Sequence, residues 1–506
     1  MSSTSIRSTA QGGPQPKLFS FTYQDTNGDW SGWYYFQIEG LSTFKMTVDW
    51  GDGTSDTYTG ASSYIPEHYF PNDNQPYKVK ISFPDQHVAS LSTNITSLNL
   101  AYDYEWYTIS DVLNLQNFPN LQSLILDYII LTPSLNISNL TALTTLGCNY
   151  TSLVSLNASG CSALTSLSYY GNSSLTSLNL SNCTALTSLT RSFSALLVSL
   201  DVSNCTALTT FNCSHNQLTS LNVTGCAALT NLNCSYNQLT SLNASNLTAL
   251  TDLDCVNNQL TSLNVSSCTA LTDLNCFNNQ LTSLNVSSLT ALQRLRCWNN
   301  QLTSLNTTGC TALTYLDCST NLLTSLNVSS CTALTELSCQ SNLLTLLNVS
   351  SCTALYRLYC GYNQLTSLNV SSCTALFTFA CQHNQLTTLN VSSNTALVSL
   401  YCDFNQLTSL DVSNLTALYG LNCIYNQLSS LNITGCTAFS VLYGSNNQLN
   451  TSNINTILSI LDSNGLINKY IDLQSQTPPA PPSSGPPDGI TAKANLITKG
   501  WGVYTD

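Results

Sequence analysis

An asparagine recurs every 21 residues from Asn216 to Asn447, twelve times without interruption. It belongs to a unit typified by TALTDLNCFNNQLTSLNVSS, residues Thr269 to Ser288. One such unit carries too little apolar surface to fold alone, so neighbouring units must stack to bury a continuous core. The period therefore predicts a solenoid, and it predicts that function is displayed along an extended face.

The charge of the chain excludes one large class of partner. Charged residues make up only 7% of the 506 residues, and 12 lysines and arginines stand against 25 acids, for a net charge of −13. Binding of nucleic acid requires a basic stripe. The repeat region offers no such stripe, because it has no lysine and only four arginines: Arg191, Arg294, Arg296 and Arg357.

The sequence predicts no insertion into a membrane. Residues 1–16 are polar, contain Gly and Pro, and lack the apolar run and cleavage pattern of a signal peptide, so we expect a flexible or attachment tail. No apolar stretch of ~18 residues occurs elsewhere. Such a chain either has lost its leader or leaves a cell by lysis or a dedicated assembly, as a virion protein does.

All 22 cysteines lie between Cys148 and Cys436, in two columns of the repeat. In the second column cysteine is replaced at Leu247, Leu289, Leu415 and Asn394. A residue that exchanges with leucine acts as a small buried hydrophobe, so we favour free thiols. Disulfides between coils are the competing interpretation. Because one thiol per coil does not converge on a tetrahedral site, we expect no zinc, and we expect no cofactor.

Residues 17–92 alternate like β-strands and contain VDWGDGT at Val48–Thr54, HYF at His68–Phe70 and YKVKI at Tyr77–Ile81. These motifs resemble the polycystic-kidney-disease (PKD) domain, an immunoglobulin-like β-sandwich. The resemblance implies a spacer or adhesion module and no chemistry. Asp49 and Asp52 carry the type of side chain that binds calcium, but shaping the tight turn is the favoured role.

Residues 93–450 follow the pattern L-x-x-L-x-C-x-x-N-x-L-x-x-L-x-V-S, strictly after Thr141, with insertions near Tyr169 and Phe193. The pattern resembles the leucine-rich repeat, in particular its short bacterial class of 21 residues. The resemblance implies about fifteen turns with parallel β-sheets. It also implies a buried ladder in which Asn279 and its equivalents satisfy backbone groups.

Residues 451–506 depart from the repeat. SNINTILSILDSNGL has the apolar spacing of a helix and is expected to close the open core, with the Pro-rich PPAPPSSGPP as a stiff linker. A second short helix and a strand are predicted for DGITAKANLITKGWGVYTD. The segment resembles C-terminal caps of leucine-rich repeat proteins from Bacteroidetes. The expected fold is therefore mainly β, a leucine-rich-repeat solenoid preceded by a PKD-like β-sandwich and closed by a small α/β cap.

The repeat also supplies an internal comparison of its positions. The second half of the unit hardly varies, with outward Ser262, Asn264, Ser266 and their equivalents, whereas the outward positions of the first half vary strongly. Side chains alternate across a strand, so we expect the variable positions to share one sheet surface. Tyr, Trp and Arg are enriched at binding hot spots. The candidate ligand-binding residues are Arg294, Arg296, Trp298, Tyr315, Arg357, Tyr359, Tyr362, Tyr401, Phe404 and Tyr425.

These positions also have a plainer explanation, because each arginine among them lies one coil from an acid. The pairs are Asp273–Arg294, Asp317–Arg296 and Glu336–Arg357. Opposite charges on neighbouring strands attract each other, and exposed aromatic residues suit β-strands by propensity alone. The arginines and aromatic residues therefore fit either a ligand face or an unconstrained sheet surface.

The sequence does not predict an enzyme. His215 and His383 occupy one repeat column eight coils apart, about 38 Å at the strand spacing, and are expected to be exposed turn residues. Asp252 and Asp273 lie in neighbouring coils like a glycosidase pair, but an open sheet offers no cleft for a substrate. No catalytic motif with a recognised mechanism is present.

Three functions fit these observations. The first is a recognition or adhesion protein on a virion or bacterial cell surface, which binds a protein or glycan through the variable face. The second is an architectural component that packs through the constant Ser-x-Asn-x-Ser face, as a homo-oligomer or within a larger assembly to which the N-terminal region attaches. The third is binding of ice or a crystal surface by the regular hydroxyl rows.

Overall fold

A computed structural model describes residues 18–23, 32–35, 37–39, 44–60, 63–64, 67–70, 77–82, 97–100, 107–109, 115, 118–131, 133–190, 197–287 and 289–506. The chain divides into two compact units, Met1–Leu229 and Thr230–Asp506. Three features considered above lie outside the described residues, namely the tail 1–16, Arg191 and the insertion at Phe193.

The N-terminal unit begins with antiparallel strands. One sheet has the order β1-β8-β4-β5, and β2 pairs with β7. Strand β3 pairs antiparallel with both β6 and β9, so residues of this segment extend the sheet of the coils that follow. The bounds are β1 Leu18–Tyr23, β2 Gly32–Tyr35, β3 Gln37–Glu39, β4 Phe44–Asp49, β5 Ser55–Gly60, β6 Ser63–Tyr64, β7 Glu67–Phe70, β8 Tyr77–Ser82 and β9 Ser97–Asn99.

The turn between β4 and β5 is held by its own aspartates. The Asp49 Oδ1 atom accepts a hydrogen bond from Gly51 N at 3.0 Å. The Asp52 Oδ1 atom accepts from the N and Oγ1 atoms of Thr54 at 2.9 and 2.6 Å. Gly51 and Gly53 have φ of 84° and 95°, which favours glycine. Both aspartates thus have the turn-shaping geometry that the sequence favours over calcium binding.

The rest of the N-terminal unit consists of coils. Strands β9, β11, β14 and β16 form one parallel stack, and β13, β15, β17 and β19 form a second. Two shorter pairs are β10 with β12 and β18 with β20. The bounds are β10 Tyr107–Ile109, β11 Ser123–Ile125, β12 Ile129–Leu131, β13 Ser134–Asn136, β14 Thr145–Gly147, β15 Ser155–Asn157, β16 Ser166–Ser168, β17 Ser177–Asn179, β18 Ser188–Leu189, β19 Ser199–Asp201 and β20 Thr210–Asn212.

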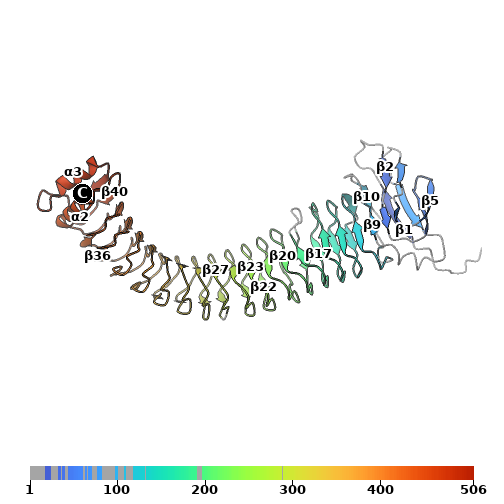
Figure 1. Ribbon diagram of the computed structural model, residues 1–506, viewed down its shortest axis with the longest axis horizontal. Coiled ribbons are helices and arrows are strands. Elements are labelled where there is room, and N and C mark those ends of the chain that lie inside the picture. The colour runs from blue at the N-terminus through green and yellow to red at the C-terminus, as the bar shows by residue number, and fades with distance from the viewer. Residues whose placement is uncertain are drawn as a thin grey trace, which may run out of the picture. The chain divides into compact units, whose positions relative to one another are not determined.

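The C-terminal unit is the regular part of the solenoid (Figure 1). Its main sheet is parallel and in register from β21 to β41, with strands mostly 21 residues apart. The bounds are β21 Asn231–Asn233, β23 Asp252–Asp254, β25 Asp273–Asn275, β27 Arg294–Arg296, β29 Tyr315–Asp317, β31 Glu336–Ser338, β33 Arg357–Tyr359, β34 Thr378–Ala380, β35 Ser399–Tyr401, β37 Gly420–Asn422, β39 Val441–Tyr443, β40 Tyr470–Leu473 and β41 Gly502–Thr505.

A second set of parallel strands comes from the constant half of the repeat. It forms the groups β22-β24, β26-β28-β30-β32 and β36-β38. The outward side chains are almost all Ser and Asn, and we call this surface the constant face. The bounds are β22 Ser241–Asn243, β24 Ser262–Asn264, β26 Ser283–Asn285, β28 Ser304–Asn306, β30 Leu326–Asn327, β32 Leu347–Asn348, β36 Ser409–Asp411 and β38 Ser430–Asn432.

The core lies inside the coils. Each coil contributes side chains to it from the same positions of the repeat. In most main-sheet strands a central leucine points inward and a cysteine follows two residues later, as in Leu295 and Cys297, which are fully buried. In β34 Phe379 takes the place of the leucine. Leucines of the second half, such as Leu302 and Leu305, complete each layer. Because each layer repeats its neighbour, identical side chains pack on each other along the solenoid.

The predicted asparagine ladder is confirmed. The Asn279 Oδ1 atom accepts a hydrogen bond from Leu260 N at 3.0 Å, and its Nδ2 atom donates to Cys255 O and Cys276 O at 3.0 and 3.1 Å. Each asparagine therefore ties one coil to the coil before it. The ladder continues after the repeat ends, because Gln476 Oε1 accepts from Leu449 N at 3.0 Å in the same manner.

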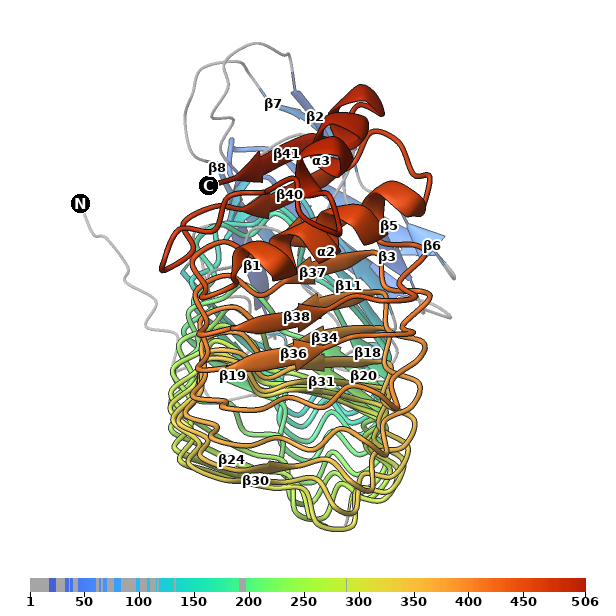
Figure 2. The same ribbon diagram turned by 90° about the vertical axis from the view of Figure 1, so that its left-hand side faces the viewer.

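The C-terminal segment contains both predicted helices and the predicted final strand. Helix α2, Thr451–Ser463, begins at Asn450, whose side chain accepts from Asn453 N, and buries Ile454, Ile457 and Leu458. Helix α3 spans Gly489–Thr498. Figure 2 shows α2 beside β38 at the end of the coils, with α3 next to α2. Strand β40 was not predicted, and it extends the main sheet by pairing with β39.

Candidate binding face

The outward side chains of the main-sheet strands β21 to β41, with the residues that directly flank these strands, form a surface that we call the variable face. Six of the ten candidate residues lie on its strands: Arg294, Arg296, Tyr315, Arg357, Tyr359 and Tyr401. The other four, Trp298, Tyr362, Phe404 and Tyr425, lie beyond the strand ends. The expectation that all ten share one strand surface is therefore wrong for these four, because each strand is only three residues long before the chain turns.

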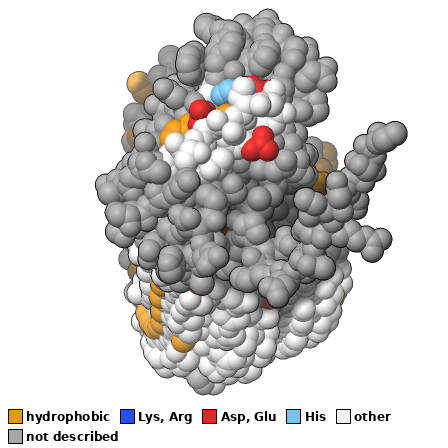
Figure 3. Space-filling model, turned by 90° about the vertical axis from the view of Figure 1, so that its right-hand side faces the viewer, with side chains coloured by type: hydrophobic (Ala, Val, Ile, Leu, Met, Phe, Trp, Pro, Cys, Tyr) orange, Lys and Arg blue, Asp and Glu red, His pale blue; other side chains and the backbone are white. Residues whose placement is uncertain are grey.

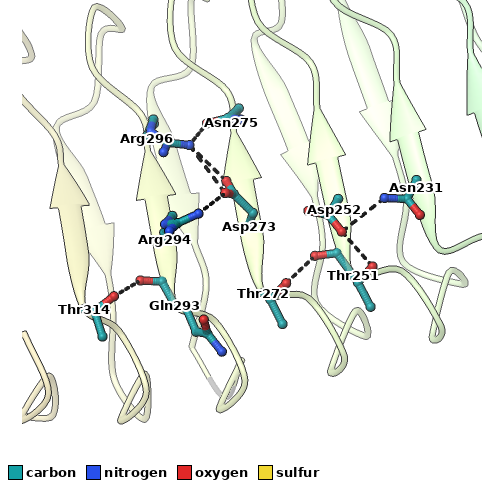
Figure 4. A network of polar contacts seen from close by, with 10 residues as sticks. All are labelled: Asn231, Thr251, Asp252, Thr272, Asp273, Asn275, Gln293, Arg294, Arg296 and Thr314. Carbon is teal, nitrogen blue, oxygen red and sulfur yellow. Dashed lines mark hydrogen bonds and ion pairs between the residues drawn. The ribbon is translucent and has the colours of Figure 1, made fainter.

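An ionic cluster occupies β25 and β27 (Figure 4). The Nη1 atom of Arg296 lies 3.1 Å from Asp273 Oδ1 and donates to Asn275 Oδ1 at 2.8 Å. Arg294 Nη1 lies 3.8 Å from Asp273 Oδ2, and its side chain is 60% exposed. One carboxylate thus faces two guanidinium groups, and the side chain of Arg294 is the more exposed of the two arginines.

Arg296 differs from the sequence-based expectation in its partner. It faces Asp273 on the preceding coil, and no ion pair with Asp317 is present among the described residues. Its guanidinium carbon lies 5.3 Å from the centre of the Tyr315 ring, which is a cation–π distance. The predicted pairs Asp273–Arg294 and Glu336–Arg357 are present, the latter at 3.4 Å.

We expect Arg296→Ala to lower the free energy of unfolding by about 1 kcal/mol or less, because a partly exposed ion pair is screened by solvent. Urea denaturation of the variant beside Arg294→Ala, whose ion pair is longer and more exposed, measures this effect. A loss of more than about 2 kcal/mol for Arg296→Ala alone would show that the cluster is structural.

Aromatic side chains stack between coils just beyond the strand ends. The rings of Phe277 and Trp298 are 4.5 Å apart with an interplanar angle of 11°. A longer stack joins Tyr362, His383, Phe404 and Tyr425, with neighbouring centres 4.2, 4.2 and 4.5 Å apart. His383 is therefore held within a stack. Sequence analysis placed this histidine in an exposed turn but missed its aromatic partners.

This four-ring stack sits on an unfavourable backbone conformation. Tyr362, His383, Phe404 and Tyr425 have φ between 51° and 54°. Asparagines such as Asn257 hold the same position in three earlier coils, and other residue types hold it in the rest. Asparagine tolerates the left-handed region, whereas tyrosine and phenylalanine rarely adopt it. The stack leaves Tyr362 and Tyr425 about half exposed, at 51% and 49%.

Four exposed tyrosines of this surface were missed as candidates. Tyr356, Tyr419, Tyr443 and Tyr504 are 42%, 48%, 41% and 47% exposed, close to the 44% of the predicted Tyr401. Tyr356 stacks on Phe377 at 4.9 Å, and Arg357 lies 5.7 Å from its ring centre. The aromatic part of the variable face thus extends from β33 to β41.

Two observations on the described residues bear on catalysis. No group of three or more His, Cys, Asp or Glu side chains among them is placed to hold a metal ion. In the N-terminal unit His68 Nε2 lies 2.7 Å from Asp52 Oδ2, and the His68 ring stacks on Trp50 at 4.7 Å. The pKa of the Asp52 carboxyl lies below its usual value. Burial acts to raise this pKa, but the hydrogen bonds from Thr54 and His68 together lower it by more. Figure 3 shows acidic side chains and a histidine on the described surface of this segment.

Comparison with known proteins agrees with the coil geometry. No protein-family model and no curated protein matches the chain. YopM from Yersinia enterocolitica WA-314 matches with 25% identity and a TM-score of 0.51, over 70% of this chain and 74% of that chain. YopM from Yersinia pestis, a leucine-rich effector protein, matches with 22% identity and a TM-score of 0.43, over 63% and 84%. The solenoid has the leucine-rich repeat fold.

A third similar structure is the functional domain of InlJ from Listeria monocytogenes, which includes a cysteine ladder. It is 29% identical over 78% of this chain and 76% of that chain, with a TM-score of 0.41. The likeness to YopM from Yersinia enterocolitica WA-314 confirms the predicted solenoid of parallel strands as a leucine-rich repeat fold. The PKD resemblance, the bacterial repeat class and the likeness to Bacteroidetes caps stay predictions. Within the described residues no helix is long and apolar enough to cross a bilayer.

The cysteines of this leucine-rich repeat solenoid are buried and free, all 22 of them. The thiol of Cys268 lies 3.2 Å from Ala244 O in the preceding coil, so this column adds a weak bond between coils. Burial raises the pKa of Cys276 to about 12 and that of Cys268 to about 11. The cysteines therefore serve the core as small hydrophobes, as their exchange with leucine indicates.

We expect the folded protein to be nearly inert to a thiol reagent such as DTNB at pH 8. A pKa near 12 leaves on the order of one thiol in ten thousand ionised, and burial blocks access. In denaturant, at the same pH and reagent concentration, the number of cysteines that react should rise to 22 if none forms a disulfide. Fewer than 22 after unfolding would demonstrate disulfides, and rapid reaction without denaturant would show that coils open locally.

Proposed function

We propose that the protein is a non-enzymatic recognition protein, displayed on a virion or cell surface, that binds a protein or glycan through the variable face. One observation carries this proposal. Between β33 and β39 the variable face exposes Tyr356, Tyr401, Tyr419 and Tyr443 by 41% to 48%, while the constant face repeats Ser and Asn. Exposed aromatic groups gathered on one surface favour a binding role over random drift.

The exposed side chain of Arg294 supports the same surface. It is 60% exposed and shares one carboxylate with Arg296. Arginine and stacked aromatic rings such as Phe277–Trp298 supply both planar hydrogen bonding and apolar contact area. The variable face therefore offers two adjoining regions, one ionic and one aromatic, to an extended partner.

Binding of labelled protein to a glycan array and to a panel of bacterial and animal cells tests the proposal. The face variant replaces Arg294, Tyr356, Tyr401 and Tyr419 with Ala. The matched control carries four Ser→Ala changes on the constant face, at Ser241, Ser262, Ser283 and Ser304. Binding that is lost in the face variant and kept in the control supports the proposal. No binding by the unaltered protein, or equal binding by both variants, would contradict it.

The alternative function is an architectural component that packs through the constant face. The observation that favours it is a group of exposed leucines, Leu322, Leu343 and Leu346, which are 46%, 39% and 64% exposed. They lie in the chain that leads into β30 and β32, where most other coils carry polar residues. If this surface packs against copies of the chain, Leu346→Ser together with the four Ser→Ala changes blocks assembly in light scattering, whereas the face variant assembles normally.

A further inference from the structure

Four tyrosines occupy every second strand at the end of the main sheet. Tyr359 pairs with Ala380, which pairs with Tyr401. The same register runs through Asn422 to Tyr443 and then through Asp472 to Tyr504. We call Tyr359, Tyr401, Tyr443 and Tyr504 the tyrosine row. The rings of the last three are 44%, 41% and 47% exposed to solvent. The row runs from strand to strand, and therefore along the solenoid axis.

Small side chains separate the first rings of the tyrosine row. Ala380, between Tyr359 and Tyr401 in the register, is only 4% exposed. The neighbouring outward position of these strands holds Thr378, Ser399 and Gly420. At the end of the row, by contrast, the Tyr470 ring packs between Tyr443 and Tyr504, with ring centres 5.2 and 5.5 Å away. The row therefore begins with separate rings and ends in a continuous aromatic surface.

The spacing of the row matches one kind of peptide backbone. Neighbouring strands lie about 4.8 Å apart, so rings on alternate strands recur about every 9.6 Å. A polyproline II helix has three residues per turn with a rise of about 3.1 Å each, or about 9.3 Å per turn. An extended β-strand repeats about every 6.7 Å and falls out of step. A proline-rich segment thus meets each ring with the same face of its helix.

The charge around the row selects among such segments. Two cations flank the row, Arg357 in the strand of Tyr359 and Lys469, whose Nζ atom lies 5.6 Å from the centre of the Tyr419 ring. Between these two residues the chain has no lysine or arginine. Asp472 lies within the row itself, between Tyr443 and Tyr504 in the register. An acidic group set between two rings complements a basic residue beside the prolines and repels an anionic ligand.

We propose that the tyrosine row binds a proline-rich segment of a partner protein in the polyproline II conformation, with a basic residue facing Asp472. The proposal rests on the proposed function of the variable face and names its partner class. Aromatic rows recognise such segments because the helix is preformed and loses little entropy on binding. Its carbonyl groups make no internal hydrogen bonds, so they accept from tyrosine hydroxyls.

Fluorescence anisotropy with a labelled synthetic peptide, RPPSPPSPPS, tests the proposal on the full chain. Its control peptides are RGGSGGSGGS, which does not hold the conformation, and APPSPPSPPS, which lacks the charge. The row variant is Tyr401→Ala with Tyr443→Ala. Its matched control is Tyr236→Ala, which removes a tyrosine of the same unit that is 49% exposed and lies off the row. Circular dichroism confirms that each variant is folded.

We expect saturable binding of RPPSPPSPPS that weakens at least tenfold in the row variant and is unchanged in Tyr236→Ala. The Gly peptide should not bind, and Asp472→Asn should remove the preference for the Arg peptide over APPSPPSPPS. No saturable binding, or equal binding to the row variant, would overturn the proposal. If a glycan or another ligand requires the variable face while the peptide does not bind, this inference fails and the proposed function stands.

Discussion

Replacing Asn321 with leucine is expected to lower the free energy of unfolding by roughly 3 kcal/mol. The Asn321 side chain is 6% exposed, and its Oδ1 atom accepts from Leu302 N at 2.9 Å. Its Nδ2 atom donates to Cys297 O, Cys318 O and Ser319 O at 3.1 Å each. The measurement is urea denaturation followed by circular dichroism.

The cost comes mainly from one backbone group. After the change Cys297 O still accepts from Asn300, and Cys318 O still accepts from Asn342. The Leu302 N–H, however, is left buried without its acceptor, and a buried unsatisfied donor costs about 1–3 kcal/mol. The lost Nδ2 bonds add the remainder.

The control for this prediction is Asn306→Leu, an exposed asparagine of β28 whose Oδ1 atom bonds only the nearby Thr308 N among the described contacts. Surface changes of this kind stay within about 0.5 kcal/mol. Equal losses for Asn306→Leu and Asn321→Leu would mean that leucine itself disturbs the coil, and the ladder would then carry no special stability.

The ladder could be predicted from the sequence because one residue type recurs at one interval. Twelve asparagines at a strict period leave a single explanation in a stacked fold, namely that the same bond forms in every coil. The two helices of the C-terminal segment were predictable for a similar reason. The apolar spacing of Ile454, Ile457 and Leu458 shows which face of α2 is buried.

The variable face could be predicted only in part. Tyr504 joins the tyrosine row through β40 and β41, which lie outside the repeat period, so only the strand pairing places it in line with Tyr443. Arg296 had an acid one coil away on either side, and sequence spacing does not tell which of Asp273 and Asp317 the long side chain reaches. The sequence therefore predicted which residues lie on this face, but which residues they contact depends on three-dimensional packing.

The four-ring stack shows a different limit. Its members recur at the repeat interval, so Tyr362, His383, Phe404 and Tyr425 carried a readable signal in the sequence. Their backbone, with φ near 52°, is a conformation that residue types of this kind do not predict. Asn257 at the same position in an earlier coil is the informative residue, because asparagine marks a left-handed turn.

Phe379→Ala is expected to cost about 3–5 kcal/mol, because it truncates a core side chain of a strand that carries the aromatic part of the variable face. Phe379 is fully buried at the centre of β34, in register between Leu358 and Leu400. Truncation leaves a cavity between the core layers of the two neighbouring coils. The asparagine ladder holds these coils at a fixed spacing, so they cannot move together to fill the cavity. Thermal and urea denaturation measure the loss.

The matched variant is Phe379→Leu, which restores the residue that Leu358 and Leu400 occupy in the neighbouring coils. It should cost less than about 1.5 kcal/mol because size and shape nearly fit the column. Since contacts in a solenoid reach only neighbouring repeats, Phe379→Ala should loosen β33 to β35 first and weaken ligand binding there before the whole unit unfolds. If the alanine and leucine variants lose equal stability, or if hydrogen exchange rises evenly across the unit, the core is not organised coil by coil.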